Sequence, residues 1–323
     1  MSNSQFFSNC TADTIREAAA ALKAGHLVAF PTETVYGLGA DARNPEAVKR
    51  IYEVKGRPSD HPLIVHISSI NQLEKWATEI PEYAIDLARA FWPGPITLIL
   101  KRTEIAQDFV TGGQETVGLR VPSDPIALAL IQEFEKISGS AIAAPSANRF
   151  GQVSPTTSAD VLEEIGEFLS DLDLVLDGGP SQIGIESTIV DCTSGSPVIL
   201  RSGFITKEEI EFILEDLGVG QASSSGIKFS GSFGKHYAPK CKVILGEYPS
   251  AGAGFLALLG IETPRGMARL GSPATIEEFA HVLYSTFREA DREGLLVLVV
   301  HPPKEVGLGV AILERLKKAA QGR

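Results

Sequence analysis

The feature that most constrains the fold is a Gly- and Ser-rich stretch in the second half of the chain. It runs from Gly220 to Pro239 (GQASSSGIKFSGSFGKHYAP) and shows no sustained helix or strand periodicity. Such a composition is typical of a linker, and loops of this length are often functional. Because 323 residues exceed the usual size of a single domain, the stretch predicts two separately packed units.

Short apolar runs alternate with amphipathic helices before the linker. One helix begins with Asn44 as N-cap and Pro45 at its first position, and Gly56 ends it; another begins with a capping box formed by Thr206 and Glu209. The segment PTETVYGLGAD is predicted as a loop. The runs predicted as strands are HLVAF, LIVHI, ITLIL, TVGLRVP, AIAAPSAN, DLVLD, STIVDC and PVILR, with helices near 82–91, 124–136 and 158–168. The pattern predicts an α/β unit with a mixed sheet.

The chain beyond the linker repeats this alternation on a smaller scale. KVILGE and LLVLVV read as strands, and the ranges 275–291 and 309–320 as helices. We expect a small Rossmann-like α/β domain there.

Composition and charge exclude several classes of protein. Hydrophobic residues make up 44% and charged residues 21%, as in an ordinary globular protein, and no window is apolar enough for a membrane span. The net charge of −11 argues against a broad nucleic-acid footprint. The start MSNSQFFSNC lacks a signal-peptide pattern, so we expect a cytoplasmic protein. Cys10, Cys192 and Cys241 are odd in number and far apart, which predicts reduced thiols without a zinc site.

Four cationic residues are the candidates for anion binding. Lys55 lies at the end of a buried helical stripe and Arg57 follows it in KGRP, so two cations leave one rigid helix end. The plainer alternative is compensation of the helix dipole. Arg120 in VGLRVP and Arg201 in VILRSG are embedded in strands, where a guanidinium needs an anionic partner. Together they predict a local anion-binding cluster in an acidic protein.

Uncharged polar residues accompany these cations. Thr34 lies in the loop PTETVYGLGAD, which suits a small polar ligand or, equally, a capped connection. His66 within LIVHI is by itself more typical of a hydrogen-bonded core residue. The segment APSANRFGQVSPT offers Ser146, Asn148 and Ser154 as neutral donors, with a strand end and a capped helix as the competing interpretation. The common phosphate-loop, dinucleotide and zinc-protease motifs do not occur.

Several of these segments resemble one known family. PTETVYGLGAD, KGRPSDHPLIVHI, FWPGPITLIL, VGLRVP, APSAN and IESTIVDC with ILRSG are similar to the YrdC/Sua5 family. HYAP and the C-terminal GLGVAILERLKKAA resemble its longer Sua5 branch. The resemblance implies a YrdC-like catalytic domain with a twisted mixed sheet over 12–206, a linker over 219–240 and a Sua5 C-terminal domain over 241–323.

The resemblance also implies an activity. Members of the family condense L-threonine, bicarbonate and ATP, with Mg²⁺, into threonylcarbamoyladenylate and pyrophosphate; the product goes to a tRNA threonylcarbamoyltransferase complex. The implied threonine contacts are Thr34, His66, Arg120, Ala144 and Ser187. The implied ATP contacts are Arg57, His61, Val117, Ser146, Asn148, Ser154, Arg201 and Tyr237, with Lys55 and Arg57 as catalytic cations. No metal ligand from the protein is implied.

The chain departs from the family pattern at two places. His61 stands where Asn is usual, and Ser230–Phe233 replaces the usual SPGM before HYAP. We expect the histidine to alter the pH dependence of ATP binding.

Two other functions stay open from the sequence. A nucleic-acid-binding module would use the positive concavity of this fold, although the acidic composition opposes it and leaves room only for a weak contact with RNA. Carbamoyl transfer to another acceptor, as in hydrogenase-maturation proteins with a YrdC-like region, is the third alternative.

Overall fold

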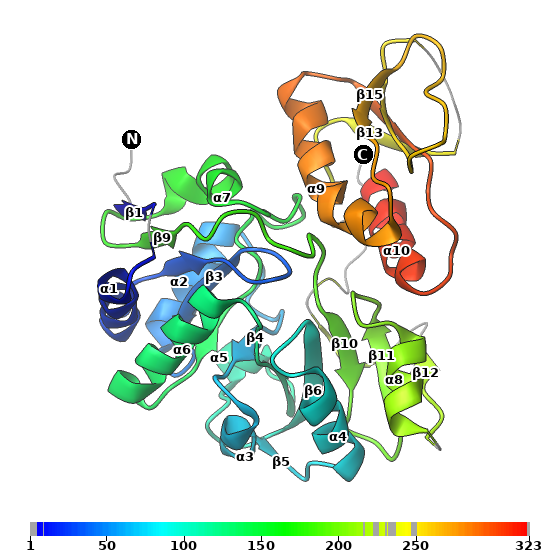
Figure 1. Cartoon of the computed structure of the whole chain (residues 1–323). Coiled ribbons are helices and arrows are strands. Elements are labelled where there is room, and N and C mark those ends of the chain that lie inside the picture. Colours follow the sequence, from blue (N-terminus) through cyan, green and yellow to red (C-terminus); the bar gives the residue numbers. More distant parts are fainter. Residues whose placement is uncertain are drawn as a thin grey trace.

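The computed structural model describes residues 5–8, 10–215, 217–221, 226–229, 231, 237–246 and 251–321. Within these ranges the chain forms two α/β units, which Figure 1 shows side by side, the larger in blue to green and the smaller in yellow to red. Residues 230–233, where the linker departs from the family pattern, lie outside the described residues except for Gly231.

The larger unit is built on one mixed sheet. In the part of the chain that the structure describes, its strands lie in the order β1-β9-β2-β3-β8-β4-β7-β6-β10-β11-β12, and β5 pairs with β6. Their bounds are β1 Gln5–Phe7, β2 Val28–Phe30, β3 Gly37–Asp41, β4 Ile64–His66, β5 Ala77–Thr78, β6 Ile96–Arg102, β7 Thr116–Arg120, β8 Ile142–Ala143, β9 Leu174–Leu176, β10 Thr188–Asp191, β11 Val198–Arg201 and β12 Gly220–Gln221. Strand β4 runs parallel to β7 and antiparallel to β8, so the predicted mixed sheet is confirmed.

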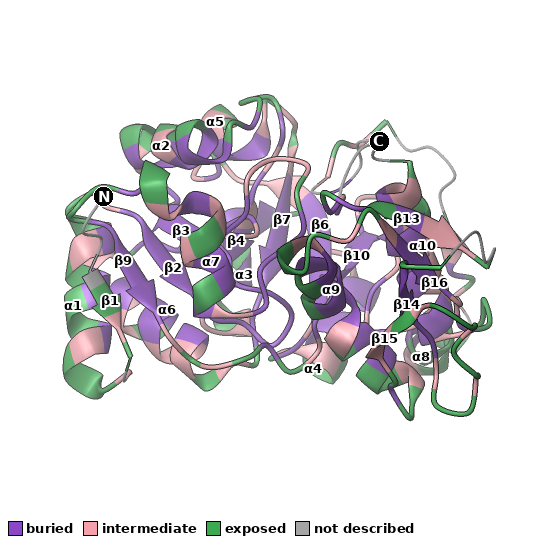
Figure 2. Cartoon of the chain, turned by 90° about the horizontal axis from the view of Figure 1, so that it is seen from above, coloured by how far each residue is buried: buried purple, intermediate pink, exposed green. Residues whose placement is uncertain are grey.

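The helices of this unit cover the sheet. They are α1 Ala12–Lys23, α2 Pro45–Lys55, α3 Leu73–Trp76, α4 Glu82–Phe91, α5 Asp108–Thr111, α6 Pro125–Ser138, α7 Ser158–Ile165 and α8 Lys207–Leu214, with 3₁₀ turns at Ile70–Gln72 and Gly166–Phe168. Asn44 accepts hydrogen bonds from the amides of the first turn of α2, and Gly56 ends that helix at φ 61°. The predicted capping box of Thr206 and Glu209 is also present. In Figure 2 the central strands of the sheet are buried and the helices expose their outer faces.

One predicted loop is wrong. The second half of PTETVYGLGAD is strand β3, which pairs antiparallel with β2. A Cβ on Gly39 would come within 2.8 Å of the Phe30 ring and of Ile142, so only glycine lets β3 pack this closely. Glycines that permit close packing look like loop residues in a sequence, which explains the error.

The smaller unit is a four-stranded parallel sheet within the described ranges, in the order β13-β16-β14-β15. Its strands are β13 Lys242–Leu245, β14 Gly254–Leu256, β15 Ala268–Gly271 and β16 Val297–Val300, and its helices are α9 Ile276–Arg292 and α10 Leu308–Ala320. The Rossmann-like α/β arrangement agrees with the prediction. Strands β14 and β15 were missed because they are short and β15 has no buried residue to give it a periodic signal.

The two units meet through α9 and α10 (Figure 1). Val35, Val153 and Ile185 of the larger unit belong to the same apolar core as the inward faces of these helices. At the rim, Arg292 of α9 pairs with Asp160 and Glu163 of α7. No helix in the described ranges is long and apolar enough to cross a membrane.

Candidate active site

A partly open cavity lies between the sheet of the larger unit and Tyr237 of the linker. Topology explains why its residues converge. Strands β4 and β7 are parallel neighbours whose last residues, His66 and Arg120, are register partners. Strands β10 and β11 are antiparallel, so Arg201 at the end of β11 lies opposite Ile189, near Ser187, which immediately precedes β10. The lining residues are Thr32, Thr34, Val35, Tyr36, Gly37, Ile64, His66, Arg120, Ala144, Pro145, Ser146, Glu186, Ser187, Arg201 and Tyr237.

One side of the cavity is formed by Thr34, His66, Arg120 and Ala144, which we call the Arg120 cluster. The guanidinium of Arg120 donates a 2.9 Å hydrogen bond to Thr34 Oγ1 and forms a 2.7 Å ion pair with Glu33. All three side chains are buried. This side therefore presents an oriented cation beside a hydroxyl, an arrangement suited to a carboxylate-bearing polar ligand.

His66 is the titratable neighbour of Arg120 in this cluster. Burial, with the positive charge of Arg120 adding to it, lowers the pKa of His66 to about 3. The ring packs edge-on against Phe30 at 6.1 Å. His66 is thus a neutral imidazole at physiological pH, able to hydrogen-bond a ligand but not to add a charge.

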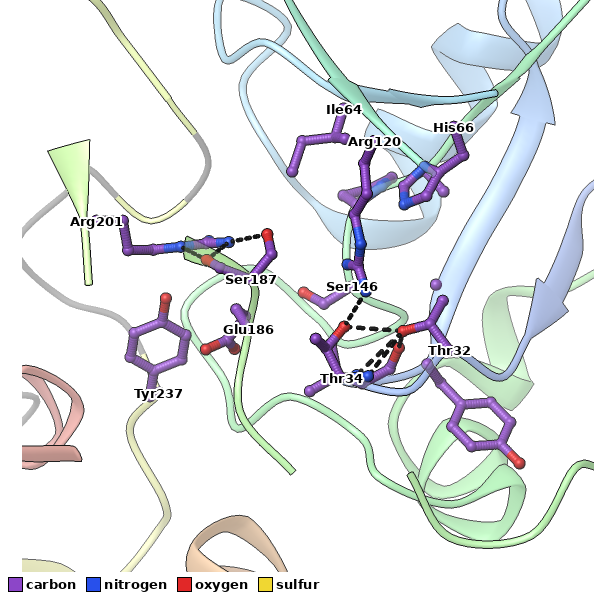
Figure 3. Close-up of a pocket in the computed structure, with 15 residues that line it drawn as sticks. Thr32, Thr34, Ile64, His66, Arg120, Ser146, Glu186, Ser187, Arg201 and Tyr237 are labelled. Carbon is purple, nitrogen blue, oxygen red and sulfur yellow. Dashed lines mark hydrogen bonds between the residues drawn. The ribbon is translucent and has the colours of Figure 1, made fainter. Parts of the chain in front are cut away.

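The other side of the cavity is formed by Ser146, Ser187, Arg201 and Tyr237, which we call the Arg201 cluster. Figure 3 shows Arg201 and Tyr237 opposite Arg120 and Thr34, with Ser146 and Glu186 between them. Arg201 donates from Nε and Nη2 to the carbonyl of Ser187 at 3.0 and 2.8 Å, and from Nη2 to Ser187 Oγ at 3.0 Å. Burial lowers the pKa of this guanidinium. A desolvated cation of this kind favours an anionic ligand.

Tyr237, from the linker, closes this side of the cavity. It has a left-handed backbone conformation with φ 63°, which is rare for a residue other than glycine and recurs at functional sites. Its ring stacks on Tyr284 of α9 with centroids 5.7 Å apart. Burial, followed by the charge of Glu186, raises the pKa of the phenol to about 12. The phenol therefore stays neutral.

Lys55 and Asn148 lie outside the cavity lining and hold one of its walls. The buried ammonium of Lys55 donates to the carbonyls of Ser146 and Asn148. The Asn148 side chain accepts from Ser146 Oγ and donates to the carbonyl of Gln152 at 2.8 Å. This geometry favours a role in shaping the APSAN loop over direct contact of Lys55 with a phosphate.

Arg57 and His61 are also outside the lining. Arg57 lines a neighbouring hollow and donates to the carbonyl of Pro62 at 3.0 Å. Burial lowers the pKa of Arg57 to about 10, and the positive charge of Arg201 acts in the same direction. His61 packs against Phe150 at 5.3 Å, and burial and Arg57 lower its pKa.

The two remaining predicted residues occupy different environments. Val117 is buried in β7, where it faces Leu100 of β6 across the strand pair. Ser154 is buried next to the cavity and donates a 2.7 Å hydrogen bond to the carboxylate of Glu186.

Three functional candidates were missed by the sequence reasoning. Glu33 was visible only as part of the hydroxyl-rich loop, although a carboxylate between Thr32 and Thr34 could have been matched to Arg120. Glu186, the residue before Ser187, binds Arg315 of α10. The signal for Arg315 was its place on the apolar stripe of its helix, three residues after Ile312 and one before Leu316.

We expect His66 to make the stability of the fold depend on pH. Because its folded pKa is about 3 and the ordinary value is 6.5, the unfolded chain binds the extra proton between these pH values. This contribution to stability is complete above pH 6.5 and is lost as the pH falls. Between pH 7 and pH 5 the wild type should lose about 2 kcal/mol of its free energy of unfolding through His66, and His66→Gln should not show this loss.

The measurement is urea unfolding of the wild type and His66→Gln at a series of pH values. The free energies of the two proteins should converge as the solution is acidified. Parallel pH profiles would contradict a neutral, buried His66.

The fold and the cavity define a class: a two-domain α/β protein whose cavity is lined by one arginine on each side, Arg120 and Arg201. Residues 20–203 match the Sua5/YciO/YrdC family model, described as "Telomere recombination", and residues 205–321 match the "Threonylcarbamoyl-AMP synthase, C-terminal domain". The chain belongs to the YrdC/Sua5 family, in its two-domain form. The predicted family resemblance is confirmed.

Close relatives cover almost the whole chain. The threonylcarbamoyl-AMP synthase of Pyrococcus abyssi is 42% identical, with 95% of this chain and 94% of that protein aligned. The Bacillus subtilis protein of the same name is 41% identical, with 96% and 93% aligned. The crystal structure of P. abyssi Sua5 complexed with L-threonine superposes with a TM-score of 0.87 at 40% identity, covering 100% of this chain and 98% of that one.

Proposed function

We propose that this chain is a threonylcarbamoyl-AMP synthase, a nucleotidyltransferase that forms threonylcarbamoyl-AMP and pyrophosphate from L-threonine, bicarbonate and ATP. The observation that carries the proposal is the meeting of the Arg120 and Arg201 clusters in one cavity. One cluster suits an amino acid and the other suits a phosphate. Relatives at 41–42% identity over most of the chain carry this synthase name, and one similar structure holds L-threonine.

Threonine would occupy the Arg120 cluster. Its carboxylate would pair with the guanidinium of Arg120, which Thr34 and Glu33 hold in place. Neutral His66 offers a hydrogen bond without competing for the carboxylate, and Ala144 offers van der Waals contact. Ser187, a member of the Arg201 cluster in the same cavity, supplies a hydroxyl to the same ligand.

ATP would occupy the Arg201 cluster and extend toward Arg57. Arg201 and Arg57 neutralise phosphate charge, while Ser146, Ser154 and His61 are the proposed hydrogen-bonding partners. Tyr237 packs over the nucleotide. Lys55 and Asn148 act through the APSAN loop that they hold.

The reaction would proceed in two steps. The threonine amine adds to CO₂ derived from bicarbonate, losing one proton and forming a carbamate. A carbamate oxygen then forms a bond to the α-phosphorus of ATP as the bond to pyrophosphate breaks. No covalent link to the protein is needed. The chain contributes by fixing both substrates in one enclosed space and by balancing the charge of the leaving pyrophosphate.

Mg²⁺ is proposed as a companion of ATP, and the cavity fits this. Glu186, the carboxylate among the lining residues, is engaged by Arg315, Tyr284 and Ser154. Within the described residues no group of three or more metal-binding side chains occurs. Such a cavity suits an ion held by phosphate oxygens and water, and a bound Mg²⁺ supplies charge neutralisation at the phosphates.

The product would serve the threonylcarbamoyladenosine modification of tRNA, passed in the cytoplasm to a threonylcarbamoyltransferase complex. An RNA contact, if made, is weak because the chain carries a net charge of −11.

The test is mass spectrometry of a mixture of the protein, ATP, Mg²⁺, bicarbonate and threonine. We expect threonylcarbamoyl-AMP together with pyrophosphate, and neither when bicarbonate is removed. Serine in place of threonine measures specificity. Absence of an AMP-linked product from folded protein would reject the synthase and, if tRNA bound tightly with a steep salt dependence, would favour the nucleic-acid-binding alternative.

A further inference from the structure

Helix α10 of the smaller unit touches the residues next to both Ser187 and Arg201 in the chain. Arg315 donates from Nε to the Glu186 carboxylate at 3.0 Å and from Nη2 to the Glu186 carbonyl at 3.2 Å. It also donates from Nη1 to the carbonyl of Ser202 at 2.6 Å. One side chain of the second domain thus joins the start of β10 to the end of β11.

The preceding residue of α10 strengthens this attachment. Glu314 accepts a 2.8 Å hydrogen bond from the hydroxyl of Ser202 and a 3.3 Å bond from its amide. Glu314 and Arg315 are consecutive in α10, and both side chains reach Ser202 at the end of β11. Ser202 is therefore held through its hydroxyl, amide and carbonyl by one helix.

Glu186 is the point where both helices of the smaller unit meet the cavity. Its carboxylate accepts from Tyr284 of α9 at 2.9 Å, from Arg315 of α10 at 3.0 Å and from Ser154 at 2.7 Å. Burial opposes its ionisation, but the positive charges of Arg315 and Arg201 outweigh burial and lower its pKa to about 2. The cavity thus contains a permanent carboxylate within the influence of Arg201, the proposed phosphate-binding residue.

A carboxylate in that place competes with phosphate unless another cation satisfies it. Arg315, only 1% exposed, is that cation. If Arg315 is removed, the buried carboxylate loses its ion-pair partner, and Arg201 is left as a cation whose charge must compensate it.

We propose that Arg315 is a positioning residue of the active site: by binding Glu186 and Ser202, it sets the position of Arg201 and keeps its charge available for the phosphates of ATP. The second domain is then part of the catalytic site as well as the support of the linker. This inference rests on the proposed function, because it takes ATP as the ligand of the Arg201 cluster.

The experiment measures ATP affinity by titration calorimetry and steady-state pyrophosphate release on the full chain. Arg315→Met should weaken ATP binding at least tenfold and lower kcat. The double variant Glu186→Gln/Arg315→Met removes the competing charge as well, and should regain most of the lost affinity. A residue that only joined the domains would show no such rescue.

Arg292→Met is the matched control. Arg292 crosses the same interface and pairs with carboxylates of α7, but it is outside the cavity lining. Arg292→Met should lower the melting temperature without changing the dissociation constant of ATP. Arg315→Lys keeps the charge but cannot bind Glu186 and Ser202 together, so it should give an intermediate ATP affinity; it carries the test if Arg315→Met does not fold.

Two results would overturn the proposal. One is wild-type ATP affinity in a folded Arg315 variant, and the other is a double variant that binds ATP no better than Arg315→Met. These are separate from failure of the proposed function: a wild-type chain that binds ATP but yields no threonylcarbamoyl-AMP rejects the synthase and leaves the affinity comparison valid.

Discussion

Replacing Arg201 with alanine should reduce kcat/KM for pyrophosphate release by about 10²–10³-fold. The reason is twofold. The cavity loses a buried cation proposed to stabilise the charge that develops on the phosphates, and Ser187 loses three hydrogen bonds that fix its carbonyl and hydroxyl. Both effects act among buried side chains, where electrostatic interactions are stronger than in water.

The measurement is steady-state pyrophosphate release with ATP and threonine varied in turn, together with the melting temperature. Arg201→Lys keeps the charge but not the forked geometry, and should recover only part of the activity. Activity of Arg201→Ala close to that of the wild type would show that the phosphates are neutralised elsewhere.

Replacing Arg120 with methionine should have the largest combined effect, on both stability and threonine use. The change leaves the carboxylate of Glu33 buried without its ion-pair partner, at a cost of about 3–5 kcal/mol in the free energy of unfolding. It also removes the proposed partner of the substrate carboxylate, so threonine saturation should disappear from the accessible concentration range.

The double variant Glu33→Gln/Arg120→Met separates these two effects. It removes both charges, so urea unfolding should show much of the stability restored, whereas calorimetry should still detect no threonine binding. Arg50→Met is a matched control, because Arg50 pairs with buried Asp173 away from the cavity. It should lower stability and leave the KM for threonine unchanged. Threonine binding by the double variant would show that Arg120 does not bind the substrate.

The local structure was largely predictable because short-range physics decides it. The caps of α2 and α8 follow from Asn44, Pro45 and Thr206, and the strands follow from runs of apolar residues. The exceptions are also physical. The sequence predicts a loop in place of strand β3 because the glycines of β3 serve close packing against Phe30, and a sequence does not distinguish that use from a turn.

The candidate site was predicted less evenly. The positions of Arg120 and Arg201 in apolar strands indicate that each guanidinium needs a partner. The sequence does not indicate which partner each one takes. In the structure Arg120 pairs with Glu33, and Arg201 donates to Ser187. The hydrogen bonds of the Lys55 ammonium to the carbonyls of the APSAN loop were also not readable from the sequence, and its catalytic role stays a prediction.

By itself, the sequence determined the α/β class, the two-part organisation and which charged residues lie in apolar segments and so need a partner. Only the tertiary structure decided that His66 lies beside Arg120 and that Arg315 reaches across to Glu186, 129 positions earlier in the chain. The physical reason is the distance along the chain over which each interaction acts. Helix and strand periodicity act over a few residues, whereas the meeting of distant side chains depends on strand register and on the packing of one domain against the other.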